Sequence, residues 1–340
     1  MNNITLANST MNDSQSQIRG LGRYVQALQS VLTETPSIET PYTFSSRKTY
    51  IDPFFNLIGK PRLERELFSG DQKIAVVHDV IPLKHLSFPW VGLKGKLWNM
   101  INQLLLQRFD IIVTDSGSSK QDIVRILNIA EKRVRVVYPY SPLQDIAHAS
   151  VPSVLPHKLK AQEYVVYVGD VNWHKNIIIM AKAALRAKVK LVCVGGAFVK
   201  QTSDHAWLGD LREFLALSEQ HPDLIILTGF VDDMILAALL QNALANILVS
   251  FDEGFGYSYI EAGHFHTPSI LTDGPVFHEI SADAGAVFVD PRDPIGIADA
   301  IVTLQKDQAK RKNLGDAAYA QSIRYSKVNF RTQWVEVLAK

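Results

Sequence analysis

The chain alternates short apolar runs with longer stretches in which apolar residues recur at helical spacing. This alternation is typical of parallel sheets whose strands are joined by helices that lie on the faces of the sheet. In the first half it predicts strands at residues 4–7, 73–78, 110–114 and 134–138. Between these strands it predicts helices at residues 22–32, 94–108 and 118–127.

The second half repeats the plan of the first. The predicted strands are at residues 164–168, 190–194, 224–227, 245–249 and 269–271. The predicted helices are at residues 176–187, 205–219, 234–241 and 260–265. Each half is long enough for one doubly wound domain. The predicted fold class is therefore α/β, with two Rossmann-like doubly wound parallel-sheet domains that face each other across a cleft.

The break between the halves should fall at residues 141–163, a stretch with three prolines and little periodicity. We therefore predict one domain at residues 1–150 and a second at residues 151–326. A C-terminal helix at residues 327–340 is expected to pack back on the first domain. Ligands bind outside the carboxyl ends of the strands in such sheets, so we expect a ligand between the two domains.

Composition and charge exclude several classes of protein. Hydrophobic residues make up 47% of the chain and charged residues 20%, the balance of a folded protein. Cys193 is the only cysteine, which excludes an intramolecular disulfide and a cysteine-based zinc cluster. The net charge of +1 divides into +4 for residues 1–150 and −3 for the remainder, too mild a charge for a nucleic-acid-binding protein.

The sequence also bears on the compartment. No apolar run approaches the ~20 residues that a membrane span needs. The first residues are polar and lack the pattern of a signal peptide. We therefore expect a cytoplasmic protein, with contact at the inner face of the membrane left open.

Residues 250–263 carry the most specific pattern in the chain. Residues 252–256 are Asp-Glu-Gly-Phe-Gly, and they follow a predicted strand, so a tight turn is expected there. A helix follows, and the backbone N–H groups at its start would bind an anion such as a phosphate. Glu253 and Glu261 are eight residues apart and can face the same site. Two carboxylates beside a phosphate site favour a ligand that also carries hydroxyl groups, such as those of a ribose and a hexose.

Five segments of the chain resemble retaining glycosyltransferase family 4, and they occur in the order in which the family has them. They are Gly20-Leu-Gly-Arg-Tyr24, His78-Asp-Val-Ile-Pro82, residues 114–120, residues 166–176, and the Glu-Gly-Phe-Gly turn with its second glutamate and the following residues 263–268. The resemblance runs through nearly all of the chain. It implies a GT-B fold, a donor bound mainly by the second domain, transfer with retention at the anomeric carbon, and no metal or other cofactor.

The resemblance also implies roles for four side chains. Glu261 would bind the ribose hydroxyls of a nucleotide diphosphate sugar, and Glu253 would hold hydroxyls of the donor sugar. Lys175 would neutralise the diphosphate as it leaves. His78 would lie near the reacting face of the sugar. Glu253, Lys175 and His78 are thus the candidate catalytic residues.

Further residues would contribute mainly backbone contacts to the donor. They are Gly254, Phe255, Gly256, Gly22, Gly229, Phe230 and Val231. The first three would lie close to the sugar and the diphosphate, and Gly22 would approach the diphosphate from the first domain. The last three resemble the loop that lies along the base.

One position departs from the family pattern. Asp170 stands where the family usually has an arginine, five residues before Lys175, so one of two expected cations is missing. A carboxylate near a diphosphate is electrostatically unfavourable unless it turns away or has a partner. Arg19, Arg23 and His174 are the candidate substitutes.

The motifs leave the exact function open. Besides a hexosyltransferase of surface polysaccharide or glycoconjugate synthesis, they allow another GT-B enzyme, such as a sugar-nucleotide epimerase, or a non-catalytic sugar-nucleotide-binding protein. The first glycine loop and the His-Asp-x-x-Pro segment look like those of mannosyltransferases, which favours mannose. The donor base, GDP or UDP, and the acceptor, a saccharide or a lipid-linked group, are not fixed by these residues.

A segment with tryptophans and lysines and a group of histidines bear on further partners. Residues 88–98 contain two tryptophans and two lysines, which fits peripheral contact with a membrane or a helix packed on the first sheet with exposed lysines. His264, His266 and His278 do not predict a metal site, because the first two lie two residues apart at a helix end and cannot share a face.

Overall fold

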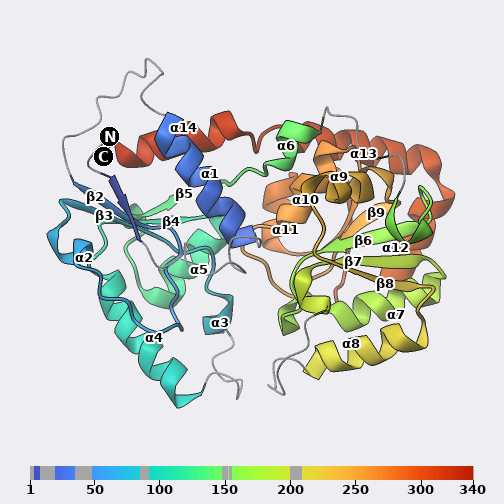
Figure 1. Cartoon of the computed structure of the whole chain (residues 1–340), viewed down its shortest axis with the longest axis horizontal. Helices are drawn as coiled ribbons and strands as arrows, with labels where there is room; N and C mark the ends of the chain where they lie inside the picture. The colour runs from blue at the N-terminus through green and yellow to red at the C-terminus, as the bar shows by residue number, and fades with distance from the viewer. Residues whose placement is uncertain are drawn as a thin grey trace. The chain divides into compact units, whose positions relative to one another are not determined.

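The computed structural model describes residues 4–7, 20–34, 48–84, 92–147, 152, 155–199 and 209–339. The chain divides into two compact units (Figure 1). Unit 1 comprises Met1–Tyr140 together with Tyr325–Lys340, and unit 2 comprises Ser141–Arg324.

Unit 1 contains a parallel sheet with the strand order β1-β2-β3-β4-β5 over its described residues. The strands are β1 (Ile4–Leu6), β2 (Thr49–Asp52), β3 (Gln72–Val76), β4 (Ile111–Thr114) and β5 (Val134–Val136). The helices are α1 (Gly20–Glu34), α2 (Glu66–Ser69), α3 (Ile81–Lys84), α4 (Leu93–Leu106), α5 (Gly117–Leu127) and α14 (Lys327–Leu338), with a 3-10 turn at Glu131–Arg133. Ser116 caps α5 by accepting a hydrogen bond from the backbone of Ser119 at 3.0 Å.

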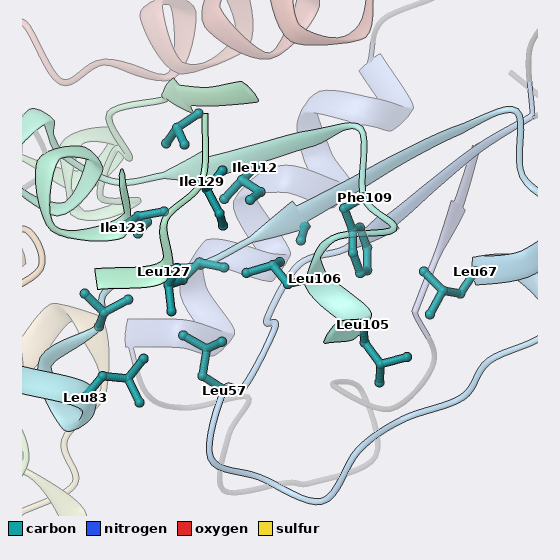
Figure 2. Close-up of a cluster of buried hydrophobic side chains, with 14 of the residues drawn as sticks. Leu57, Leu67, Leu83, Leu105, Leu106, Phe109, Ile112, Ile123, Leu127 and Ile129 are labelled. Carbon is teal, nitrogen blue, oxygen red and sulfur yellow. The ribbon is translucent and has the colours of Figure 1, made fainter. Parts of the chain in front are cut away.

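The sheet of unit 1 takes part in two hydrophobic cores. One contains residues of α4 and α5, including Leu105, Leu106, Ile123 and Leu127, which Figure 2 shows around Ile112 of β4. The other core packs α1 and α14 against residues of β2, β3 and β4 and buries the ring of Trp334 completely. Each fully buried large apolar side chain contributes roughly 1.5–3 kcal/mol to folding. The C-terminal helix is therefore an integral part of unit 1.

Unit 2 contains a second parallel sheet, with the order β11-β10-β9-β6-β7-β8 over its described residues. The strands are β6 (Tyr164–Val168), β7 (Lys190–Val194), β8 (Ile225–Gly229), β9 (Ala245–Leu248), β10 (Ser269–Thr272) and β11 (Ala286–Val289). The helices are α6 (Leu143–Ile146), α7 (Ile177–Ala187), α8 (Gly209–Gln220), α9 (Asp233–Asn242), α10 (Tyr257–His264), α11 (Pro275–Ser281), α12 (Pro294–Lys306) and α13 (Gln308–Ser322), with 3-10 turns at Pro156–Lys158, Trp173–Lys175 and Gly196–Phe198.

The order of strands in unit 2 reverses at its centre. From β6 the chain proceeds to β7 and β8 on one side of β6, and then to β9, β10 and β11 on the other. Parallel sheets of this kind bind ligands at the carboxyl ends of the two strands where the order reverses. The loops that follow β6 and β9 therefore occupy the expected ligand-binding position of this sheet.

The predicted fold class, two doubly wound parallel-sheet domains, is confirmed by the two sheets. The predicted strands agree with the observed ones within one or two residues. The prediction missed β2 and β11, two four-residue strands. It also missed the short helices α2, α3 and α6 and the helices α11, α12 and α13. Residues 205–208, the first part of one predicted helix, lie outside the described residues.

Candidate functional site

Two loops meet at the carboxyl edge of the sheet of unit 2. The loop after β6 contains the 3-10 turn Trp173–Lys175, and the loop after β9 runs from Val249 to Gly256. The backbone N–H of Phe251 donates a hydrogen bond to the carbonyl of His174 at 2.7 Å. This bond ties the two loops together at the point where the strand order reverses.

The side chain of Asn176 also links these loops. Its buried side-chain amide donates to the carbonyl of Val249 at 2.9 Å and to the carbonyl of Pro291 at 2.7 Å. Its backbone is left-handed, with φ of 58°, a conformation that asparagine tolerates better than most residues. One side chain thus connects the ends of β6, β9 and β11.

Lys175 and Glu253 form an ion pair within this arrangement. The Nζ atom of Lys175 lies 2.7 Å from Oε1 and 2.8 Å from Oε2 of Glu253, and the side chains are 18% and 8% exposed. The hydroxyl of Ser250 also donates to Oε1 of Glu253, at 2.7 Å. Limited exposure strengthens such charge-assisted bonds, because little water competes for the charges. The structure therefore brings together two of the three predicted catalytic residues.

The turn after β9 has the backbone that its glycines predict. Gly256 is the N-cap of α10 and has a φ of +100°, which residues with a side chain rarely adopt. A Cβ atom at this position would lie 2.9 Å from Cδ1 of Ile280. Phe255 is buried, and its ring packs edge-to-face on Tyr257 at 5.4 Å. Gly254 lies in the same turn, between Glu253 and Phe255. This turn conformation places Glu253 in contact with Lys175.

Glu261 lies in α10 and is only 4% exposed. Its Oε1 atom accepts a hydrogen bond from the hydroxyl of Ser141 at 2.9 Å. The same hydroxyl oxygen accepts from the backbone N–H of Leu143 at 3.3 Å, at the start of α6. The carboxylates of Glu253 and Glu261 are therefore both engaged with polar groups of unit 2.

Glycines line the neighbouring strand ends of this sheet. The backbone N–H of Gly169 donates to Val194 at 3.1 Å, and that of Gly195 donates to Gly229 at 3.0 Å. Gly229 ends β8 with a φ of +70°. Beyond it Phe230 is exposed, whereas Val231 packs partly against the core of unit 2.

Asp170, the departure from the family pattern, has local partners. Its Oδ1 atom accepts a hydrogen bond from the backbone N–H of Val171 at 2.8 Å, and Oδ2 accepts one from the amide of Asn172 at 3.5 Å. The hydroxyl of Tyr167 donates to the carbonyl of Asp170 at 2.6 Å. The carboxylate thus stabilises the loop that leads to Lys175. Of the substitute cations, Arg23 lies in α1 and His174 beside Lys175, and Arg19 is outside the described residues.

His78 lies in unit 1, just after β3. Its Nδ1 atom is 2.7 Å from Oδ2 of Asp115, which follows β4, and Nε2 is 3.3 Å from the carbonyl of Pro53. Tyr24, two residues after the buried Gly22 in α1, packs edge-to-face on the ring at 4.7 Å. Burial lowers the pKa of His78, but the carboxylates of Asp115 and Asp79 and the carbonyl of Pro53 together outweigh it, so that the pKa is raised.

Asp52, at the end of β2, provides a test of the electrostatics in unit 1. Burial raises its pKa from 3.8 to about 6, although the backbone N–H of Phe54 donates to its Oδ1 at 3.0 Å. The folded state therefore binds more protons than the unfolded state between these two values, so the free energy of unfolding falls as the pH rises through this window.

We expect Asp52→Asn to stabilise unit 1 at neutral pH. Asparagine keeps an acceptor for Phe54 and carries no charge. The substitution should therefore raise the free energy of unfolding by about 1–3 kcal/mol at pH 7. At pH 4 it should change little, because the aspartate is already protonated in the folded state. Urea unfolding at both pH values measures this, and an equal change at the two would contradict it.

Two of the three histidines within residues 264–278, His266 and His278, have carboxylate partners. His266 pairs with Asp316 at 2.9 Å and stacks on Tyr319, and His278 lies between Asp273 and Asp283. No cluster of three or more histidine, cysteine or acidic side chains with the geometry of a metal site occurs among the described residues. Over the described residues, no helix combines the length and the apolar character that crossing a membrane requires.

The part of the chain that contains these loops is similar to a known protein family. Residues 156–321 match the family model of glycosyl transferases group 1. The match covers most of unit 2, from the residues before β6 to the end of α13. It includes the two loops that carry Lys175 and Glu253, and the helix that carries Glu261.

Two curated glycosyltransferases are similar over about two thirds of the chain. The O-antigen chain mannosyltransferase RfbU of Salmonella typhimurium is 27% identical over 232 residues, 68% of this chain and 60% of that protein. The O-antigen chain mannosyltransferase B of Escherichia coli is 27% identical over 235 residues, 66% and 59% of the two chains. The chain thus spans about three fifths of the length of the curated relatives that it matches.

Solved structures of similar fold support the two-domain architecture. The Anabaena protein HepE, solved in complex with UDP and glucose, superposes with a TM-score of 0.67 at 17% identity, over 94% of this chain and 83% of that one. A sucrose-phosphate synthase from Thermosynechococcus elongatus superposes with a TM-score of 0.62 at 20% identity, over 78% and 67%. At such low identity the likeness establishes the fold alone, which is GT-B.

Three residues that contact the candidate site residues or their loops were not predicted from the sequence: Ser250, Asn176 and Ser141. Ser250 lies two residues before the predicted turn at residues 252–256, so its hydroxyl could have been expected near Glu253. Asn176 stands next to Lys175, but a single asparagine before a helix carries no specific signal. Ser141 is 120 positions from Glu261 in the sequence and gave no signal at all.

Proposed function

We propose that the chain is a retaining, metal-independent glycosyltransferase. It transfers a hexose, with mannose preferred, from a nucleotide diphosphate sugar to a saccharide or lipid-linked acceptor in the synthesis of a surface polysaccharide. The similarity to two O-antigen mannosyltransferases supports this substrate class. The family match at residues 156–321 supports glycosyl transfer.

The observation that carries the proposal is the ion pair between Lys175 and Glu253 at the reversal point of the unit 2 sheet. A cation and a carboxylate at one place suit a ligand that has both a phosphate and hydroxyl groups. In the free protein the two side chains neutralise each other. On donor binding the diphosphate replaces Glu253 as the ion-pair partner of the Lys175 ammonium group. Hydroxyl groups of the sugar then donate hydrogen bonds to Glu253.

The reaction then follows from the charges that develop in it. The bond between the anomeric carbon and the diphosphate oxygen breaks, and negative charge builds up on the departing oxygen. Lys175 and the N-terminus of α10 stabilise that charge. The acceptor hydroxyl attacks from the same face of the sugar, and its proton leaves with the diphosphate. His78, which is oriented by its hydrogen bond with Asp115, lies near the reacting face of the sugar.

A thermal-shift screen with nucleotides and nucleotide sugars tests donor binding. A ligand that binds only the folded state raises the melting temperature, by an amount that grows with ligand concentration over Kd. We expect GDP-mannose or another nucleotide sugar to stabilise the wild type. Glu261→Ala is expected to abolish this shift, because it removes the carboxylate assigned to the ribose.

The matched control for this experiment is Ser141→Ala. It removes the hydrogen bond to Glu261 and leaves the carboxylate in place, so a shift should persist. An undiminished shift in Glu261→Ala would remove Glu261 from the ribose role. Product analysis separates the alternative functions: an epimerase converts the donor without an acceptor, and a binding protein yields no product with any acceptor.

A further inference from the structure

Helix α4 of unit 1 buries two asparagines beside its core leucines and exposes large apolar residues on its outer side. Asn99 and Asn102 are buried on its inner side. On its outer side four large apolar residues are exposed: Leu93 (88%), Leu97 (51%), Met100 (58%) and Leu104 (67%). A helix normally turns such residues towards the core. The exposure of these leucines and of the methionine is therefore unusual for a surface helix.

The helix cannot bury these residues by rotating about its axis. The side-chain amide of Asn102 lies 3.0 Å from the carbonyl of Asn56, 3.2 Å from that of Leu57 and 2.8 Å from that of Gly59. Leu105 and Leu106 of the same helix belong to the hydrophobic core shown in Figure 2. Rotation would break these bonds and empty this part of the core. The outward orientation of the apolar residues is thus built into unit 1.

The four residues form one continuous stripe. Their spacing of four, three and four positions keeps them within one narrow sector of the helix. At about 100° per residue, Lys94 and Lys96 lie on opposite sides of the stripe, at roughly 90° and 70° from its centre. Both lysines are exposed, and neither forms an ion pair with another described residue. The stripe therefore has a positive charge on each flank.

No negative charge on the helix balances these lysines. The segment Leu93–Leu106 contains no aspartate or glutamate. The sequence of unit 1 has 20 lysines and arginines against 13 aspartates and glutamates. An apolar stripe between basic residues complements a bilayer with anionic headgroups, where the apolar side chains enter the acyl boundary and the lysines remain at the headgroups. A helix of 14 residues is too short to span the bilayer and would lie in its surface.

We propose that the stripe formed by Leu93, Leu97, Met100 and Leu104 docks unit 1 on a membrane surface that contains anionic lipid. A second copy of the chain is the other conceivable occupant. Parallel stripe-to-stripe pairing would bring the lysines of two copies together, which is unfavourable, and in either orientation the facing helix offers these lysines no acidic partner. The charge pattern therefore favours the lipid surface over the protein.

Flotation with vesicles tests the docking surface without donor or acceptor, so that its outcome is independent of the glycosyltransferase proposal. We expect the wild type to bind phosphatidylcholine vesicles that contain 30% phosphatidylglycerol, a mixture that supplies the anionic surface. Lys94→Gln/Lys96→Gln should lower the partition coefficient roughly 25-fold, about 5-fold for each lost charge. Leu97→Gln/Met100→Gln/Leu104→Gln should lower it at least about 100-fold.

Matched control variants carry the same change elsewhere. Ile295→Gln and Val328→Gln replace exposed apolar residues of α12 and α14 and should leave binding unchanged. Circular dichroism melting verifies that each variant is folded. Equal binding by the triple variant and the wild type, or no binding by the wild type, would overturn the proposal. It would also be overturned if light scattering found a wild-type dimer that the triple variant cannot form.

Discussion

Lys175→Met is expected to lower kcat/KM for sugar transfer by about 10²–10³, the usual loss when one group that stabilises developing charge is removed. Methionine has nearly the length of lysine and lacks the ammonium group. The departing diphosphate would lose its cation, and of its partners among the described residues the carboxylate of Glu253 would keep only Ser250. We also expect a loss of about 1–3 kcal/mol in stability, because the carboxylate is largely buried. Steady-state kinetics and urea unfolding measure the two effects.

The control for this variant is Lys182→Met in α7. Lys182 pairs with Glu213 at 3.0 Å, but both side chains are more than half exposed. Such a surface pair contributes no more than about 1 kcal/mol, so stability and transfer should stay close to wild type. If Lys175→Met transferred sugar within threefold of the wild-type rate, Lys175 would not be the group that neutralises the diphosphate.

Gly195→Ala is expected to impair both stability and activity. A Cβ atom at this position would lie 2.3 Å from the carbonyl oxygen of Gly169, far inside van der Waals contact. The backbone of the loop after β6 must then move, and this loop carries Lys175. We expect a loss of roughly 1–3 kcal/mol, typical of overpacking, and a fall in kcat/KM of at least about tenfold.

The neighbouring residue provides a matched control. A Cβ atom on Gly196 would meet no heavy atom within 4 Å, so Gly196→Ala makes the same chemical change in open space. Its kinetics and urea midpoint should be close to those of the wild type. Similar behaviour of the two alanine variants would show that the close approach of Gly195 to Gly169 does not hold the loop.

The sequence predicts best where one local signal suffices. The strands Tyr164–Val168 and Lys190–Val194 were predicted with their observed bounds, because both are apolar runs, apart from Lys190 at the start of the second, and lie largely buried in the sheet. The turn before α10 was predicted from its glycines, and Gly256 has the positive φ that makes glycine necessary. In each case a few neighbouring residues carry the whole signal.

Features that depend on distant parts of the chain could not be predicted in this way. The strand β2 has only four residues, Thr-Tyr-Ile-Asp, and is recognisable only by its pairing with β1 and β3. Lys175 and Glu253 were each singled out, but their direct contact joins residues 78 positions apart. The partnership of Ser141 with Glu261 likewise depends on how α6 packs near α10. These contacts are consequences of strand order rather than of local composition.

The return of α14 to unit 1 has a consequence for synthesis of the protein. The ribosome makes residues 1–140 of this unit before it makes unit 2, but Phe330 and Trp334, which complete one of its cores, are made only after unit 2. Until α14 emerges, the nascent chain must expose the apolar surface that these two rings later cover. A premature stop codon between unit 2 and α14 would therefore damage a part of the molecule that was translated much earlier, and would leave it prone to aggregation.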